Sequence, residues 1–539
     1  MTSLSPILDR RTALTGTCAI LFAAGLSDQA LAVTSGVFED VRRHGARGDG
    51  KAIDSPAINR AIQAAAKRGG GTVVVPPGRY LCFTIRLMDN IAIVLSAGAT
   101  IVAADPDTHG ANYDPPENYL EEQFQDFGIT HVNNSLIRGN GVTNVAILGP
   151  GMLHGLGLDR DGPGERWHGR GVWQSAAAQG ISAKEQALKD PKERAAVGRA
   201  NKTIGLMNCR GVRLSGFTIL QAGHFGVIAH GCTNMQIEGL VIDTDRDGID
   251  IDACRDVRVL NCTVNSPKDD AIVLKSSYAL GRAVPCEDVL VSGCKTSGYL
   301  MGTLLDGTYR RSPYDAEGVG PLGRIKLGTE SNGGFRNIRI TDCICTASRG
   351  ILVGIVDGGT LEDVSVSNIT IRDPYNHPLF VHHGARMRAP KGTPVGKVRR
   401  VRFDQISVTG AHPRYPCGVE GIADAPVEDV TFRDIDIVAR GGGTREDAAR
   451  VPEYRRETSL EVSYLGTLPA AGLYARHARR LTVRGFSLRT ETPDARPVFA
   501  LRNVAGAILD DIATPARRED VVDTKDSSAV ALGQVATAL

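Results

Sequence analysis

Several features of common protein classes are missing from this 539-residue chain. Aromatic residues make up only 5% of it, and basic and acidic residues nearly balance, which leaves a net charge of +2. A field this weak attracts neither nucleic acid nor an anionic membrane, so neither is expected as a partner. There is no Cys-x-x-Cys pair and no His/Cys spacing of a zinc site. We therefore predict no metal and no cofactor.

Glycine, in contrast, is abundant, with 62 residues. The apolar fraction of 42% and the charged fraction of 23% are ordinary for a soluble globular protein. Many glycines with few large side chains favour a solenoid with many tight turns over a compact barrel.

The first 32 residues are typical of an export signal. Arg10-Arg11 precede the apolar stretch 19–26, which is too short to span a bilayer, and Ala30-Leu-Ala32 offers small residues for cleavage. The paired arginines indicate the twin-arginine route, with an ordinary signal as the alternative. We expect a mature domain of residues 33–539 that is periplasmic or secreted. No later segment is apolar enough to cross a membrane.

A short motif, polar-polar-apolar-x-apolar, recurs along the chain, and its closest copies lie 22 residues apart. The copies begin at Thr143, Thr233, Arg255, Glu287, Arg336, Glu362 and Glu428. Each copy predicts a short strand that cannot bury its apolar side alone. Stacking successive coils about 4.8 Å apart builds a continuous apolar interior. The leucine-rich repeat has a similar period, but its leucine and asparagine pattern and its repeated helices are missing.

These repeats predict an all-β, right-handed parallel β-helix forming a single domain. A helix is predicted after Asp54-Ser-Pro56, which supplies a capping residue, Asp54, and a proline in the first turn. On this helix Ile58, Ala61, Ile62 and Ala65 share one face, and Gly69 ends it. We expect it to cap the open N-terminal end. Insertions near 103–135, 155–200 and 299–323 interrupt the repeat, and the second contains a charged helical stretch at 182–199. We expect the insertions to stand over the face that carries the chemistry.

Ten cysteines follow the signal segment, several at repeated positions beside the strand motif. Cys232, Cys254 and Cys286 each precede a copy, whereas Cys262 and Cys294 each follow one. Such placement predicts ladders of free, buried thiols, although export permits disulfides as the alternative.

Two acidic segments lie one coil apart: Asp245-Arg-Asp-Gly-Ile-Asp-Ile-Asp252 and Lys268-Asp-Asp-Ala-Ile-Val-Leu-Lys275. When Asp247 is aligned with Asp270, the apolar side chains of the two segments point inward and Lys275 points outward. The inward residues are Ile249, Ile251, Ile272 and Leu274. Asp247, Asp269 and Asp270 then converge at a turn that leads into one sheet. Crowded carboxylates raise one another's pKa, which favours an acid beside a base. The alternatives are simple turn chemistry or an acidic ladder that binds calcium.

These two segments resemble the Asn-Thr-Asp and Gly-Asp-Asp motifs of glycoside hydrolase family 28, the polygalacturonase family. The opening, Gly45-Ala-Arg-Gly-Asp-Gly50 and residues 69–78, is similar to that of pectin-degrading β-helix enzymes in general. The resemblance implies Asp269 as general acid, Asp247 and Asp270 as the groups that hold the attacking water, and inversion at the anomeric carbon.

The chain also departs from the family pattern. Tyr299 stands where a Gly-His-Gly motif would place histidine, and Leu352 and Gly354 replace the basic pair of a later Arg-Ile-Lys motif that clasps a sugar carboxylate. Arg324-Ile-Lys326 lies one coil early. Its basic residues serve a shifted sugar subsite or are solvated surface charge.

Further candidates for sugar contact are Lys275, Tyr299, Glu330, His224 and His383, with a packed or turn residue as the alternative for each histidine. The leading hypothesis is a monomeric, metal-independent hydrolase of a pectic or related polysaccharide or oligosaccharide, and the long insertions indicate exo-action. The rival hypotheses are a polysaccharide lyase on the same fold and a non-catalytic carbohydrate-binding β-helix.

Overall fold

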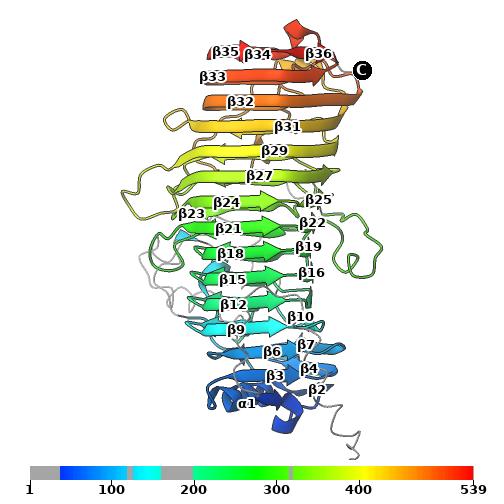
Figure 1. Ribbon diagram of the computed structural model, residues 1–539, viewed down its shortest axis with the longest axis vertical. Helices are drawn as coiled ribbons and strands as arrows, with labels where there is room; N and C mark the ends of the chain where they lie inside the picture. The colour runs from blue at the N-terminus through cyan, green and yellow to red at the C-terminus, as the bar shows by residue number, and fades with distance from the viewer. Residues whose placement is uncertain (1–36, 118–123, 126, 160–197, 315–319, 538–539) are drawn as a thin grey trace, which may run out of the picture.

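The computed structural model describes residues 37–117, 124–125, 127–159, 198–314 and 320–537. The predicted signal segment 1–32 and most of the helix predicted at 182–199 lie outside these residues. The described chain forms one column of stacked coils, with the C-terminus at the end opposite helix α1 (Ser55–Ala66) (Figure 1). Adjacent coils pair in parallel. The predicted right-handed parallel β-helix is confirmed.

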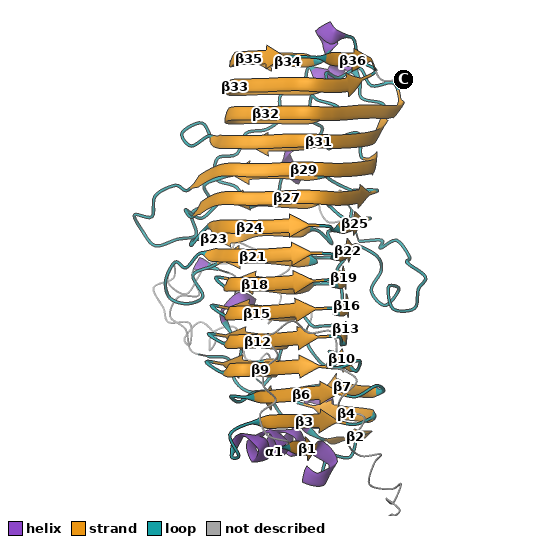
Figure 2. Cartoon of the chain, viewed as in Figure 1, coloured by secondary structure: helices purple, strands orange, loops and turns teal. Residues whose placement is uncertain are grey.

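Three parallel sheets run along the column (Figure 2). The first contains β1 (Phe38–Asp40), β3 (Gly71–Val75), β6 (Ile91–Leu95), β9 (Thr143–Leu148), β12 (Arg210–Ser215), β15 (Thr233–Glu238), β18 (Arg255–Leu260), β21 (Cys286–Ser292), β24 (Phe335–Thr341) and β35 (Ser528–Leu532). The second contains β2 (Asp49–Ile53), β4 (Gly78–Cys82), β7 (Ala99–Ala103), β10 (Met152–His154), β13 (Thr218–Leu220), β16 (Val241–Asp243), β19 (Thr263–Asn265), β22 (Lys295–Ser297), β25 (Ile344–Thr346) and β36 (Val535–Thr537).

The third sheet, called the site sheet below, carries the acidic segments. It contains β5 (Ile85–Arg86), β8 (Ser135–Asn140), β11 (Lys202–Met207), β14 (Phe225–His230), β17 (Asp247–Asp252), β20 (Ile272–Ser276), β23 (Ile325–Ser331), β26 (Ile351–Ile355), β28 (Leu379–His383), β30 (Cys417–Glu420) and β34 (Val522–Lys525). Five longer strands run through more than one sheet: β27 (Thr360–Arg372), β29 (Lys397–Ala411), β31 (Val427–Gly441), β32 (Leu473–Thr492) and β33 (Phe499–Thr514).

The repeated motif has a backbone explanation. Its second residue has φ between 53° and 57° in every copy: Asn144, Asn234, Asp256, Asp288, Asn337, Asp363 and Asp429. Asn and Asp tolerate this left-handed conformation better than other residues that have a side chain. The residue turns the chain, and the next apolar side chain then points inward.

Inward side chains form one continuous core, which includes Ile249, Ile251, Ile272 and Leu274 as predicted. The cysteines that the structure describes are all free and buried, so the prediction of buried thiols is confirmed.

Helix α1 covers the N-terminal end and buries Ile58, Ala61, Ile62 and Ala65. The role predicted for Asp54 was wrong in one respect. Its side chain makes no capping hydrogen bond to the helix but accepts from the backbone N–H groups of Arg47 (2.7 Å) and Gly48 (3.0 Å). Asp54 therefore ties the opening loop to the cap.

The remaining helices are short: η1 (Val41–His44), α2 (Pro106–His109), α3 (Phe127–Thr130), α6 (Arg445–Ala448), η5 (Ser463–Leu465) and η6 (Arg518–Asp520). Among the described residues no helix has the length and apolar character needed to cross a bilayer. The long connections β7–β8, β10–β11 and β22–β23 lie at the three stretches predicted as insertions.

Candidate active site

The two acidic segments stack in the predicted register. Ile249 pairs with Ile272, Ile251 with Leu274, and Asp252 with Lys275. Asp247 begins β17, while Asp269 and Asp270 end the turn before β20. The backbone N–H of Asp270 donates to the carboxylates of Asp247 (3.2 Å) and Asp269 (3.1 Å). Both segments therefore deliver carboxyl groups to one edge of the site sheet.

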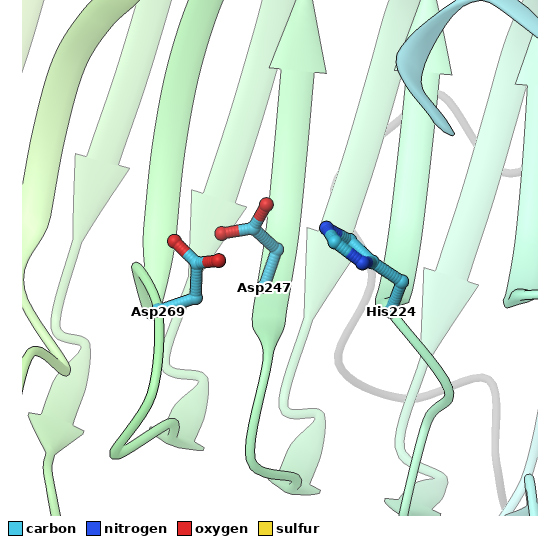
Figure 3. Close-up of side chains that lie close together, drawn as sticks. All are labelled: His224, Asp247 and Asp269. Carbon is cyan, nitrogen blue, oxygen red and sulfur yellow. The ribbon is translucent and has the colours of Figure 1, made fainter. Parts of the chain in front are cut away.

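Asp247, Asp269 and His224 lie together on neighbouring coils (Figure 3). Each offers an atom that lies within 4.8 Å of an atom from each of the other two. Arg246 joins the group, because its Nη2 lies 3.1 Å from Asp269 Oδ2 and 3.2 Å from His224 Nε2.

Asp270 is held by two cations. Arg324 Nε donates to one carboxylate oxygen at 2.5 Å and Lys326 Nζ donates to the other at 3.0 Å. Burial acts to raise the pKa of Asp270, but Arg324 and Lys326 lower it to about 2. Asp270 is therefore ionised down to about pH 2, with both oxygens engaged.

The pKa of Asp247 is shifted in the opposite direction to that of Asp270. Burial raises its pKa well above the ordinary value, and the neighbouring Asp250 and Asp269 raise it further. Lys275 donates to Asp250 at 2.6 Å but lies 3.5 Å from Asp247, so it offsets this only in part. Burial also raises the pKa of Asp250, to about 7. Asp247 therefore keeps its proton under conditions in which Asp270 is ionised.

Solvent reaches this cluster on one side. The side chains of Asp269 and Arg246 are 24% and 20% exposed, whereas Asp247 and Asp270 are buried. Asp269 is therefore the carboxyl group that an incoming ligand meets first.

Comparison with known proteins gives the same picture of the fold. The family model described as rhamnogalacturonase A/epimerase, pectate lyase-like matches residues 38–170. The exopolygalacturonase of Thermotoga maritima superposes with a TM-score of 0.55 at 22% identity, covering 75% of this chain and 88% of that one. The family 28 exopolygalacturonase of Yersinia enterocolitica gives 0.54 at 15% identity, covering 93% and 78%. This chain has the fold of the family 28 polygalacturonases.

A curated relative matches a short stretch only. Alginate lyase 7 of Azotobacter vinelandii is 42% identical over 65 residues, which are 12% of this chain and 8% of that protein. The resemblance to family 28 that the motifs indicated is confirmed at the level of the fold.

The structure shows what surrounds Leu352 and Gly354, the two residues that replace the basic pair of the family 28 pattern. Leu352 belongs to a second apolar cluster on the outer side of the site sheet, together with Leu460. A Cβ at Gly354 or Gly328 would collide with the Leu460 side chain. The positions expected to carry a basic pair therefore lie beneath residues 456–468, a segment between β31 and β32 that we call the strap.

The strap supplies a site residue that sequence reasoning missed. Glu461 Oε2 lies 3.1 Å from Arg324 Nη1 and 3.3 Å from Arg349 Nη1. Burial acts to raise the pKa of Glu461, but Arg324, Arg349 and Lys326 lower it to about 2. Glu461 is 137 residues from Arg324 in the sequence, so no local motif could have revealed it.

The predicted binding residues divide into two groups. The first group lies with the carboxylates and contains Lys275, Arg324, Lys326 and His224. Glu330 belongs to the same network. Burial acts to raise its pKa, but Lys275 and Arg386 lower the pKa below its ordinary value.

Tyr299 and His383 do not join this network through any contact among the described residues. The Tyr299 ring packs on Tyr309, and the His383 Nδ1 contacts the carbonyl of Ala425. Sugar contact by these two stays a prediction.

His224, Asp247 and Asp269 also have the spacing of metal ligands. The guanidinium of Arg246 contacts both His224 and Asp269 and puts a positive charge where an ion would bind. The trio therefore fits a proton-transfer site better than a metal site.

Proposed function

We propose that this protein is a glycoside hydrolase acting on a pectic or related plant polysaccharide or oligosaccharide. The observation that carries the proposal is the convergence of three carboxyl groups with different surroundings. Burial and neighbouring carboxylates raise the pKa of Asp247, Arg324 and Lys326 lower that of Asp270, and Asp269 faces solvent. Hydrolysis of a glycosidic bond needs one carboxyl group that gives a proton and one that accepts a proton from water.

Asp247 and Asp269 form the reacting pair in this proposal. The family resemblance implies Asp269 as the acid, and its exposure suits contact with the glycosidic oxygen. The buried Asp247 keeps one proton within the pair. Asp247 hands this proton to Asp269, which passes it to the leaving oxygen as the glycosidic bond breaks. Water attacks the anomeric carbon, and the Asp247 carboxylate takes the proton of the water, so the pair again holds one proton.

Asp270 has a different role from the one the resemblance implies. Arg324 and Lys326 engage both of its oxygens and hold it as an anion, so we assign it an electrostatic role. Its fixed negative charge beside the anomeric carbon stabilises the positive charge that develops there in the transition state.

The distance between the two carboxyl groups bears on whether the reaction inverts or retains the configuration of the anomeric carbon. Oxygens of Asp247 and Asp269 approach within 4.8 Å. Inverting pairs have carboxyl groups about 6.5–9.5 Å apart and retaining pairs about 5–5.5 Å. The separation of Asp247 and Asp269 is therefore closer to that of a retaining pair, whereas the resemblance implies inversion. We keep inversion as the proposal from the resemblance, and the anomeric form of the first product decides between inversion and retention.

Two substitutions test the assignment. We expect Asp247→Asn and Asp269→Asn each to lower kcat/KM by about 10²–10⁴-fold, because each removes one member of the acid/base pair. Activity is measured as new reducing ends on a panel of pectic polymers and oligomers.

The matched control is Asp256→Asn, an exposed aspartate on β18 whose backbone conformation asparagine also adopts. It should leave both activity and melting temperature unchanged. Unchanged activity in either site variant contradicts the proposal.

Export and exo-action are also proposed, from the N-terminal signal features and the long insertions. A mature chain that begins after Ala32 in the periplasm or medium supports export, and retention in the cytoplasm contradicts it. Random mid-chain cleavage of a long polymer contradicts exo-action.

A further inference from the structure

Glu461 occupies a cage of cations. Two guanidinium groups face its carboxylate, those of Arg324 and Arg349, and Lys326 adds its charge. The side chains of Arg324 and Arg349 are 3% and 1% exposed, whereas that of Glu461 is 18% exposed. We call the space among these three cations, which the partly exposed Glu461 carboxylate fills, the cationic pocket.

This pocket adjoins the reacting carboxylates. Arg324 donates through Nε to Asp270 and through Nη1 to Glu461, so a single guanidinium separates the two anions. Planar guanidinium groups with several donors are the side chains that recognise carboxylates. A sugar bound at Asp269 would thus stand beside a carboxylate-recognising pocket that the protein itself has filled.

The strap fixes Glu461 in place from both sides. Leu460 and Val462, its two neighbours, are buried in the second apolar cluster with Leu352 and Phe380. Further along, the Tyr464 hydroxyl donates to Glu420 at 2.9 Å. Buried apolar anchors on either side make Glu461 a resident part of the site.

Four cations around the site form ion pairs with carboxylates of the protein. Among the described residues, Lys275 pairs with Asp250, Lys326 with Asp270, Arg246 with Asp269, and Arg386 with Asp357. Each of these four cations therefore already faces an anion of the protein.

We infer that Glu461 is a specificity-determining residue that takes the place of a substrate carboxylate, so that the sugar beside Asp270 is a neutral one. This inference rests on the proposed function and adds the substrate class. A uronic acid at that subsite would have to displace a carboxylate of the protein that is already ion-paired.

Removing the Glu461 side chain should open the pocket. We expect sodium acetate to raise the melting temperature of Glu461→Ala more than sodium chloride at equal ionic strength, because a ligand that binds only the folded state stabilises it. D-galacturonate should bind this variant about tenfold more tightly than D-galactose, a difference attributable to the sugar carboxylate. Wild-type protein should show neither preference.

Glu453→Ala is the matched control, since the exposed Glu453 carboxylate pairs with the exposed Arg455, away from the cationic pocket. It should behave as wild type. A folded Glu461→Ala that acetate stabilises no more than chloride overturns the inference, as does a wild-type protein that already prefers D-galacturonate. If the variant does not fold, the wild-type comparison alone decides, with equal binding of the two sugars supporting the inference.

These measurements follow binding and not turnover, so they separate the two proposals. Gain of carboxylate binding in a protein that hydrolyses no glycan keeps the pocket and refutes the hydrolase. Hydrolysis of substrates with a uronate at this subsite keeps the hydrolase and refutes the pocket.

Discussion

At the residue scale, neighbouring acidic side chains differ because their surroundings differ. Asp247 and Asp270 are both buried, yet the pKa of one is raised and that of the other is lowered. The sequence located both, because an Asp-Asp pair one coil after Asp-Gly is a recognisable pattern. It could not give their charge states, because these depend on Arg324 and Lys326 from a later coil.

Asp270→Asn should strongly destabilise the fold. The substitution leaves Arg324 and Lys326 buried without their shared carboxylate, and breaking a buried ion pair in this way costs about 3–5 kcal/mol. The control is Asp429→Asn, which breaks an exposed pair with Arg480 and should cost less than about 1 kcal/mol. Denaturant unfolding compares the two, and equal losses would contradict the ion-pair account.

The left-handed position of the repeat gives a second prediction. Asn234 is exposed, with φ of 55°. Asn234→Val should destabilise by about 1–2 kcal/mol, because a branched side chain is strained there. Asn234→Gly, which adopts the conformation freely, should be nearly neutral in the same denaturant unfolding experiment. A valine variant as stable as the glycine variant would refute the conformational explanation.

At the element scale, short strands and the capping helix were predictable, whereas the strap was not. Strand positions follow from a local alternation that repeats every coil. The strap contains no such repeat, and its anchors Leu460 and Val462 contact residues about a hundred positions earlier, among them Leu352 and Phe380. Local patterns carry no information about a contact of this kind.

Leu460→Ala should weaken the strap. Leu460 is fully buried over Gly328 and Gly354, and removing a buried leucine side chain costs about 2–5 kcal/mol. Val451→Ala, at an exposed position just before the strap, should stay within about 0.5 kcal/mol of wild type. Thermal unfolding and limited proteolysis measure the difference. Equal protease sensitivity in the two variants would show that Leu460 does not anchor the strap.

At the scale of the whole molecule, buried ion pairs make the free energy of unfolding depend on pH. Asp270 and Glu461 both have folded-state pKa values of about 2, below the values near 4 of the unfolded chain. Groups with a lowered folded pKa stabilise the protein above the unfolded pKa, and this contribution is lost as pH falls through the folded pKa.

The free energy of unfolding should therefore decrease between about pH 5 and pH 2, by about 2–3 kcal/mol for each group at most. Denaturant unfolding across this range measures the loss, and Glu461→Ala should show a shallower decrease than wild type. A stability that stays constant from pH 5 to pH 2 would contradict the pairing of these two carboxylates.

Product analysis by proton NMR tests most directly whether the Asp247–Asp269 pair splits a glycosidic bond with water. Wild-type protein incubated with a pectic oligosaccharide panel should release a saturated sugar with a new reducing end, and Asp269→Asn should release none. An unsaturated product, as from a lyase, or an epimerised sugar in an uncleaved chain would contradict the account.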